Sequence, residues 1–317
     1  MGHVEDGKWV RGEGFPTDRK GGYARPESKF RCSSDVPADA VVAGRFHLYA
    51  AYACPWAHRT LIARALGGLQ SAMSVSIVNP FMGEDGWDFS PADGVVADPI
   101  HGAAHLWEVY VAAQPDYTGR VTVPVLWDRE RGTIVCNESR EILRMFTTVF
   151  APLGTPTVRL CPPELQPQID ATIDRNYRPI NNGVYRAGFA RTQAAYDEAV
   201  HELFAALDAW EPVLARQRFT CGNQLTEADI CLFTTLLRFD AVYHGHFKCN
   251  LRRLADYPNL WGFVRDVYQT PGVAETVRMD HIKEHYYRSH AHINPTRIVP
   301  AGPLLDLDAP HGRERLG

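Results

Sequence analysis

The chain has 317 residues, enough for one large domain or for two modest ones with hydrophobic cores. Hydrophobic residues make up 45% of the composition and charged residues 22%, the proportions of an ordinary soluble globular protein. The formal net charge of −4 speaks against nucleic acid or an anionic membrane as the main partner. No apolar run approaches the roughly 18 residues of a membrane span.

The N-terminus and the cysteines indicate the cellular compartment of the protein. Met1 to Lys20 is polar and rich in glycine, without the apolar core of a signal peptide. The seven cysteines are odd in number and scattered, without the spacing of a disulfide scaffold. Both observations favour a reducing compartment, most simply the cytoplasm.

The first third of the chain changes from an irregular to an α/β pattern. Residues 1–42 carry glycine, proline and charge with little periodicity, which predicts an extended arm. A strand is then expected over Phe46–Ala50, a helix from Thr60 to about Leu66, and a second strand over Ser74–Val78. Residues 79–119 form a long insertion with one helical stretch near 103–113, and loops of this length are usually functional or disordered.

A hairpin and a helix are predicted to complete the α/β pattern. Residues 121–128 and 133–137 read as two strands joined at Arg129–Gly132. Glu138-Ser139 opens a helix whose apolar face comprises Ile142, Leu143, Phe146 and Val149.

The rest of the chain is predicted to be helical. The proline-rich stretch from Ala151 to Pro167 has the composition of a linker. Five helices are expected beyond it, at 165–177, at 192–214, from a capping signal at 226–229 to Arg238, at 258–268 and at 271–277. The predicted domains are an N-terminal extension (1–42), an α/β domain (43–152), a linker (153–167), an all-helical domain (168–290) and a C-terminal tail (291–317).

Cys54 is the most informative residue, because it directly precedes Pro55 where a strand hands over to a helix. A cysteine at the positive end of a helix dipole, near free backbone N–H groups, is favoured as the thiolate that attacks sulfur and carbon electrophiles. Ala57 occupies the position of a second thiol, so the site is monothiol. The alternative is a buried structural cysteine.

This combination, a Cys-Pro at the first helix and a proline opening the third strand, resembles the glutathionyl-hydroquinone reductases, also called the Xi class of glutathione transferases. The resemblance runs from about Gly21 to Pro303. It implies an N-terminal thioredoxin-like domain joined to a C-terminal all-helical glutathione-transferase domain. The segments that carry it are Ala53–Thr60, Gly86-Trp87, Val123–Asp128, Asn181–Ala190, Tyr243–Asn250 and His285–His290.

The resemblance implies a glutathione site in the first domain. Pro124 would follow a cis peptide bond, so that Val123 pairs with the cysteinyl backbone of glutathione. Glu138 would accept from the γ-glutamyl ammonium, and Ser139 with the first helical amides would receive its carboxylate. From the residues alone, the favoured interpretation of Pro124 is an edge-strand proline and that of Ser139 is a helix cap; the resemblance reverses this preference for Pro124.

Other residues receive roles by the same resemblance. Arg120 would clamp the glycyl carboxylate, and Trp87 would flank the peptide and shield the sulfurs from water. Tyrosines that combine a flat apolar body with one hydroxyl would line a second pocket for the hydroquinone ring. These are Tyr185, Tyr243 and Tyr286, with Tyr287 as an ambiguous neighbour of Tyr286.

The implied reaction is thiol chemistry. Cys54 would attack the sulfur that joins glutathione to the ring, and a second glutathione would release glutathione disulfide from the Cys54 mixed disulfide. Glutathione is thus a co-substrate, no metal is needed, and a homodimer is expected. The alternatives are a conjugating or thiol-transferase type of glutathione transferase acting on other electrophiles or mixed disulfides, and a non-catalytic binding module.

Two other patterns point to metal chemistry and are set aside. His281–His285 matches H-x-x-E-H of inverted zinc proteases, but no third ligand is evident. His244, His246 and Cys249 could ligate a soft metal, although a loop between helices is the simpler interpretation.

Overall fold

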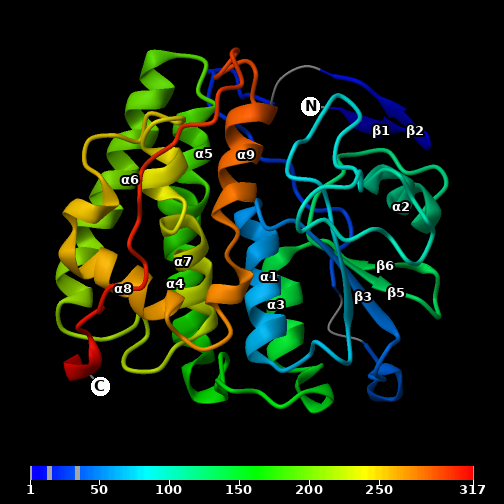
Figure 1. The fold of residues 1–317 in the computed structure, drawn as a ribbon, viewed down its shortest axis with the longest axis horizontal. Helices are drawn as coiled ribbons and strands as arrows, with labels where there is room; N and C mark the ends of the chain where they lie inside the picture. Colours follow the sequence, from blue (N-terminus) through cyan, green and yellow to red (C-terminus); the bar gives the residue numbers. More distant parts are fainter. Residues whose placement is uncertain (1, 13–15, 33–35, 317) are drawn as a thin grey trace. The chain divides into compact units, whose positions relative to one another are not determined.

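The computed structural model describes residues 2–12, 16–32 and 36–316 (Figure 1). These residues form two compact units. Unit 1 comprises those within 2–12, 26–157 and 276–299, and unit 2 those within 16–25, 158–275 and 300–316. None of the described helices is both long and apolar enough to cross a membrane.

The sheet of unit 1 has four strands in the order β4-β3-β5-β6. Strand β3 pairs in parallel with β4 and antiparallel with β5, and β5 pairs antiparallel with β6. All residues of β3 are buried, as in a central strand covered on both faces. The predicted strands are confirmed, with bounds β3 (Phe46–Ala50), β4 (Ser74–Ile77), β5 (Val125–Asp128) and β6 (Thr133–Cys136).

Two helices of unit 1, α1 (Pro55–Leu66) and α3 (Ser139–Thr147), pack against each other (Figure 1). Helix α1 begins at Pro55 and not at the predicted Thr60, because proline at the first helical position has its φ preset and loses no hydrogen bond. Helix α3 buries three of its four predicted apolar positions, whereas Val149 lies beyond its last turn and is half-buried.

The long insertion after β4 is folded and contains α2 (Leu106–Ala113), near the predicted helical stretch. The carboxylate of Asp98 organises the segment before this helix. It accepts from the backbone N–H of Ile100 at 2.9 Å and from the hydroxyl of Tyr49 at 2.8 Å. The insertion is thereby tied to the central strand of the sheet.

The predicted extended arm is wrong for the first residues, which form a hairpin of β1 (His3–Glu5) and β2 (Lys8–Val10). Its two-residue turn, Asp6-Gly7, has φ values of 46° and 75°. Asp-Gly between two short strands is a strong hairpin signal, because both turn residues must adopt positive φ. The polar composition of the strands concealed this pattern.

A helix that the sequence patterns did not predict, α9 (Met279–Ser289), belongs to unit 1. The predicted helix at 271–277 is only a 3-10 turn, Ala274–Thr276. The chain leading into α9 contacts α1, where a ring nitrogen of His58 lies 2.8 Å from the hydroxyl of Thr276. The residues of α9 fall within the predicted all-helical domain (168–290), whereas their contacts place them in unit 1. The domain boundaries themselves remain a prediction.

Unit 2 is helical, and the predicted helices 165–177, 192–214, 226–238 and 258–268 are confirmed. The apolar positions predicted for the longest helix, from Val200 to Trp210, are buried. The helices are α4 (Gln166–Asn176), α5 (Gly183–Gly188), α6 (Gln193–Leu214), α7 (Glu227–Leu236) and α8 (Pro258–Tyr268), with π-helical turns at Tyr177–Asn181 and Phe239–Tyr243.

The remaining short elements are 3-10 turns at Ala38–Ala40, Ala151–Leu153, Pro163–Leu165, Leu254–Asp256 and Glu314–Leu316. Two of them lie in the proline-rich stretch that was predicted to be a linker.

Candidate active site

Cys54 is the N-cap residue of α1, as its position before Pro55 predicts. Its backbone is extended, with φ −79° and ψ 121°, so the chain turns into the helix immediately after the thiol. Among the described free cysteines, Cys54 alone is half-buried, while Cys161, Cys221, Cys231 and Cys249 are buried. Cys54 is therefore the partly exposed cysteine of this group, and it lies at the positive end of a helix dipole.

Val123 lies next to this thiol. The Sγ atom of Cys54 is 3.8 Å from the carbonyl oxygen of Val123, to which the thiol donates. The Val123–Pro124 peptide bond is cis, which confirms the expectation drawn from the resemblance. Pro124 directly precedes β5, so the sulfur lies beside the start of that strand.

Glu138 and Ser139 form the start of α3. Glu138 is the N-cap residue, and its carboxylate accepts from the backbone N–H of Arg140 at 3.3 Å. Ser139 is buried, and its hydroxyl accepts from the guanidinium of Arg59 at 3.4 Å. A helix N-terminus and a buried guanidinium both favour an anion here, while the Glu138 carboxylate favours a cation.

Trp87 is buried, with an exposed fraction of 7%, and its ring stacks on that of His285 at a centroid distance of 4.7 Å. The Nδ1 atom of His285 lies 2.9 Å from the carbonyl oxygen of Pro80, which accepts its proton. Helix α9, which carries His285, thus supplies a packing partner for Trp87. Arg120 is half-buried, and its backbone carbonyl accepts from the hydroxyl of Tyr117 at 2.7 Å.

The candidate tyrosines are divided between the units. Tyr286 and Tyr287 lie on α9 in unit 1. Tyr286 is buried, with its ring edge-on to that of His285, whereas Tyr287 is half-buried and burial raises its pKa.

Tyr185 and Tyr243 are neighbours in unit 2, with ring centroids 6.0 Å apart in an edge-to-face arrangement. The guanidinium of Arg25 lies 4.9 Å from the centroid of the Tyr185 ring, and its Nε donates to Asn182 at 2.8 Å. Tyr243 also stacks on Phe247, with a centroid distance of 5.5 Å. Unit 2 thus presents these two phenols within one aromatic cluster.

Comparison with known proteins identifies the family. The profile of the glutathione S-transferase N-terminal domain matches residues 53–149, and that of the C-terminal domain matches residues 193–266. Glutathionyl-hydroquinone reductase YqjG of Escherichia coli is 50% identical over 99% of both chains. Glutathionyl-hydroquinone reductase PcpF of Sphingobium chlorophenolicum is 52% identical over 97% of this chain and 98% of its own.

Comparison with solved structures points to the same family. The Xi-class glutathione transferase from Natrialba magadii is 53% identical, with a TM-score of 0.93 over 100% of this chain and 97% of that one. The glutathione-bound structure of YqjG is 50% identical, with a TM-score of 0.86 over 99% of each chain. The chain belongs to the glutathionyl-hydroquinone reductases, the Xi class of glutathione transferases.

The fold expected for a Xi-class transferase is therefore present: a thioredoxin-like N-terminal domain and an all-helical C-terminal domain. Three residues that contact the candidate site were not predicted from the sequence to do so. Ser28 donates to Glu138, Arg59 contacts Ser139, and His285 stacks on Trp87. Arg59 lies within a segment that carries the resemblance, but nothing near Ser28 signals a partner 110 residues away.

The histidines of the H-x-x-E-H pattern have other contacts in this transferase. The Nε2 atom of His281 lies 2.6 Å from the carbonyl oxygen of Asp93, and Nδ1 of His285 lies 2.9 Å from that of Pro80. Each histidine thus has one ring nitrogen in contact with a backbone carbonyl oxygen. Cys249, from the other pattern, is buried, and burial raises its pKa.

Proposed function

We propose that the protein reduces glutathionyl-hydroquinones to hydroquinones with glutathione as co-substrate, through a mixed disulfide between glutathione and Cys54. The observation that carries the mechanism is the position of Cys54. It is a half-buried thiol at the N-cap of α1, with its sulfur beside Val123. The relatives' printed activity supplies the substrate class.

Glutathione would be held through both ends and its backbone. The γ-glutamyl ammonium pairs with the Glu138 carboxylate, and its carboxylate meets Ser139 at the N-terminus of α3, where Arg59 adds positive charge. Val123, next to the cis Pro124, pairs with the cysteinyl backbone. Arg120 clamps the glycyl carboxylate, and Trp87 shields the sulfurs from water.

The reaction has two exchange steps. The Cys54 thiolate attacks the glutathionyl sulfur, the sulfur–carbon bond to the ring breaks, and the ring carbon takes up a proton as hydroquinone forms. A second glutathione thiolate then attacks the mixed disulfide, and its sulfur bonds to the first glutathione. Glutathione disulfide leaves, and Cys54 returns as a thiolate.

Tyr185, Tyr243 and Tyr286 are assigned to the ring, with Tyr287 as a further contact. A phenol can stack on the hydroquinone and exchange a proton with its oxygen or with the departing carbon. Unit 2 holds two of these phenols together, and unit 1 holds Tyr286.

Ionisation of the thiol supplies only part of the rate. Lowering a cysteine pKa from about 8.5 to about 6 raises its thiolate fraction at neutral pH roughly thirtyfold, and lower basicity costs some nucleophilicity. Positioned reactants reach effective molarities many orders of magnitude higher. Holding the two sulfurs in line is therefore the larger contribution.

The proposal is tested by turnover of a synthetic glutathionyl-hydroquinone with excess glutathione, following release of the sulfur-free ring. Cys54→Ala should lose turnover by about 1,000-fold or more, because it removes the nucleophile, and should still bind glutathione. Cys161→Ala, which changes a buried cysteine of unit 2, should retain activity. Full activity of Cys54→Ala, or no turnover by the unmodified protein, would contradict the proposal.

Assembly and location complete the proposal. We infer a homodimer and a cytoplasmic location, which fit glutathione as the co-substrate. Light scattering of the purified protein and fractionation of the source cells test the two statements separately.

A further inference from the structure

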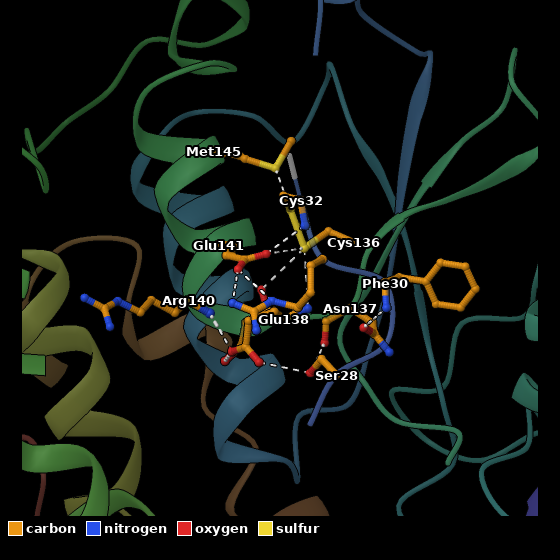
Figure 2. Close-up of a disulfide and its surroundings, with 11 residues drawn as sticks. Ser28, Phe30, Cys32, Cys136, Asn137, Glu138, Arg140, Glu141 and Met145 are labelled. Carbon is orange, nitrogen blue, oxygen red and sulfur yellow. Dashed lines mark hydrogen bonds and ion pairs between the residues drawn. A yellow bond between two sulfur atoms is a disulfide. The ribbon is translucent and has the colours of Figure 1, made fainter. Parts of the chain in front are cut away.

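A disulfide joins Cys32 of the N-terminal extension to Cys136 at the end of β6 (Figure 2). The two residues are 104 positions apart, and the scattered cysteines gave no indication of this pair. Cys136 lies two residues before Glu138. In the proposed function, Glu138 binds the γ-glutamyl ammonium. The sulfur pair thus lies at the edge of the proposed glutathione site.

Residues 28–32, which end at Cys32, are here called the arm segment. They run along the loop after β6. Phe30 and Asn137 exchange two bonds: the backbone N–H of Asn137 donates to the Phe30 carbonyl at 2.9 Å, and the Phe30 N–H donates to the Asn137 side chain at 3.1 Å. The hydroxyl of Ser28 donates to Oε2 of Glu138 at 2.9 Å (Figure 2). The arm segment therefore positions the carboxylate that the ligand would use.

The sulfur environment suits both redox states. The Sγ atom of Cys136 lies 3.5 Å from Oε2 of Glu141 and 3.8 Å from the carbonyl oxygen of Glu138, so a thiol there would have acceptors. The Sγ atom of Cys32 lies 3.2 Å from the sulfur of Met145. Cys136 is fully buried, whereas Cys32 is half-buried, so an external thiol or disulfide reaches Cys32 first.

We propose that Cys32 and Cys136 form a second thiol–disulfide centre, which exchanges with glutathione disulfide and sets the affinity of the neighbouring site for glutathione. This inference rests on the proposed function for the location of that site. The ligand chemistry is a low-molecular-weight disulfide, and glutathione disulfide is the product that the proposed reaction itself supplies.

The exchange balances without another reactant. The Cys32 thiolate attacks one sulfur of glutathione disulfide, forms a mixed disulfide and releases one glutathione thiolate. The Cys136 thiolate then attacks the Cys32 sulfur, closes the protein disulfide and releases the second glutathione. The two cysteines lose two electrons, glutathione disulfide gains them, and the two thiol protons pass to the released glutathione.

The coupling follows from the contacts of the arm segment. In the oxidised state a covalent bond holds it against the loop, and Ser28 keeps Glu138 oriented. In the dithiol state it rests on hydrogen bonds alone, so the oriented carboxylate is present for a smaller fraction of the time. Apparent affinity falls in proportion to that fraction, and we expect the oxidised protein to bind about threefold to tenfold more tightly.

The test uses the full chain carrying Cys54→Ala, so that exchange at the proposed catalytic thiol is absent. The protein is equilibrated over a range of glutathione to glutathione disulfide ratios with a chelator present, because the ligand atoms of Cys32, Cys136 and Glu141 lie within 4.8 Å of one another and could hold a metal. Alkylation and peptide mass spectrometry then report the state of both cysteines. Calorimetry with S-methylglutathione, which cannot reduce a disulfide, reports the affinity of each state.

Three variants make the result specific. Cys32→Ser should bind like the dithiol protein at every redox ratio, and Cys136→Ala repeats the test at the other sulfur. Ser28→Ala should keep the disulfide and lose most of the affinity difference between the two states. Cys161→Ala should behave like its parent.

The inference is overturned if Cys32 and Cys136 stay alkylatable at every ratio, or if the two states bind S-methylglutathione equally. These outcomes are independent of turnover, so they are distinct from a failure of the proposed function. Absence of S-methylglutathione binding in both states would refute the glutathione site and the coupling together, while the alkylation result would still decide whether the two cysteines exchange.

Discussion

His47 lies in the central strand β3 with its ring fully buried between two serines. Its Nδ1 atom is 2.7 Å from the hydroxyl of Ser74, and its Nε2 atom is 2.9 Å from that of Ser76. Ser76 donates its own proton to the carbonyl of Ala97 at 2.8 Å, so it accepts from an Nε2–H. The neutral ring with its proton on Nε2 therefore satisfies both contacts.

Stability should fall in mild acid because of this residue. Burial, and then the nearby Arg129 cation, lower the pKa of His47 to about 4, against about 6.5 in an unfolded chain. Below pH 6.5 the unfolded state binds a proton that the folded state refuses, so this contribution is complete above pH 6.5 and is lost as the pH falls toward 4. The loss reaches about 3 kcal/mol of unfolding free energy.

His47→Gln keeps a polar side chain but does not titrate. Urea unfolding at several pH values between about 7 and about 4.5 should give a shallower loss of stability for the variant than for the parent. Parallel pH profiles would show that His47 does not carry this pH dependence.

Glu138 makes the charge-dependent contact that the proposed function needs. Glu138→Gln should raise the KM for glutathione about tenfold or more, because it removes the charge opposite the γ-glutamyl ammonium, and should change kcat much less. Steady-state kinetics with the synthetic substrate measure both values. Glu130→Gln, at an acid of the β5–β6 turn that pairs with Arg45, is the matched control, and an unchanged KM in Glu138→Gln would remove Glu138 from the site.

At the scale of elements, the start of α7 depends on one buried carboxylate. Asp229 accepts from the backbone N–H and the hydroxyl of Thr226, both at 2.8 Å, which closes a capping box. It also accepts from the N–H and the hydroxyl of Thr220, both at 2.7 Å. One side chain therefore fixes the helix N-terminus and the loop before it.

Asp229→Ala should lower the free energy of unfolding by about 3 kcal/mol or more, because it leaves buried donors without their acceptor. Asp229→Asn retains one acceptor oxygen and should cost less. Thermal and denaturant unfolding of the two variants check the order, and equal stability of Asp229→Ala and the parent would contradict the role given to this box.

The elements that the sequence predicted well carry local signals. Helix α7 has its capping box. Helix α1 was expected, but its start was predicted at Thr60 although Pro55 at its first position carried a signal for an earlier start. Helix α9 has no such signal, since its N-cap residue is Arg278 and makes no side-chain cap, and it was missed. The hairpin at 3–10 did carry a signal in Asp6-Gly7 that could have been used.

At the scale of the whole molecule, chain segments distant in sequence complete unit 1. After the chain leaves unit 1 it comes back to it twice, with residues 26–157 and with residues 276–299. The position of Cys54 could be predicted because a strand, a proline and a helix adjoin it in sequence. The contacts of Ser28 with Glu138, of His285 with Trp87 and of Cys32 with Cys136 could not, because tertiary folding alone brings these residues together.

The central claim is that Cys54 bonds transiently to glutathione, and a single turnover tests it most directly. The protein is mixed with a glutathionyl-hydroquinone in the absence of free glutathione, and intact mass and peptide mass spectrometry follow. We expect one glutathionyl unit on Cys54 and one equivalent of released hydroquinone. Release of hydroquinone with Cys54 unmodified, or with the glutathionyl unit on another residue, would contradict it.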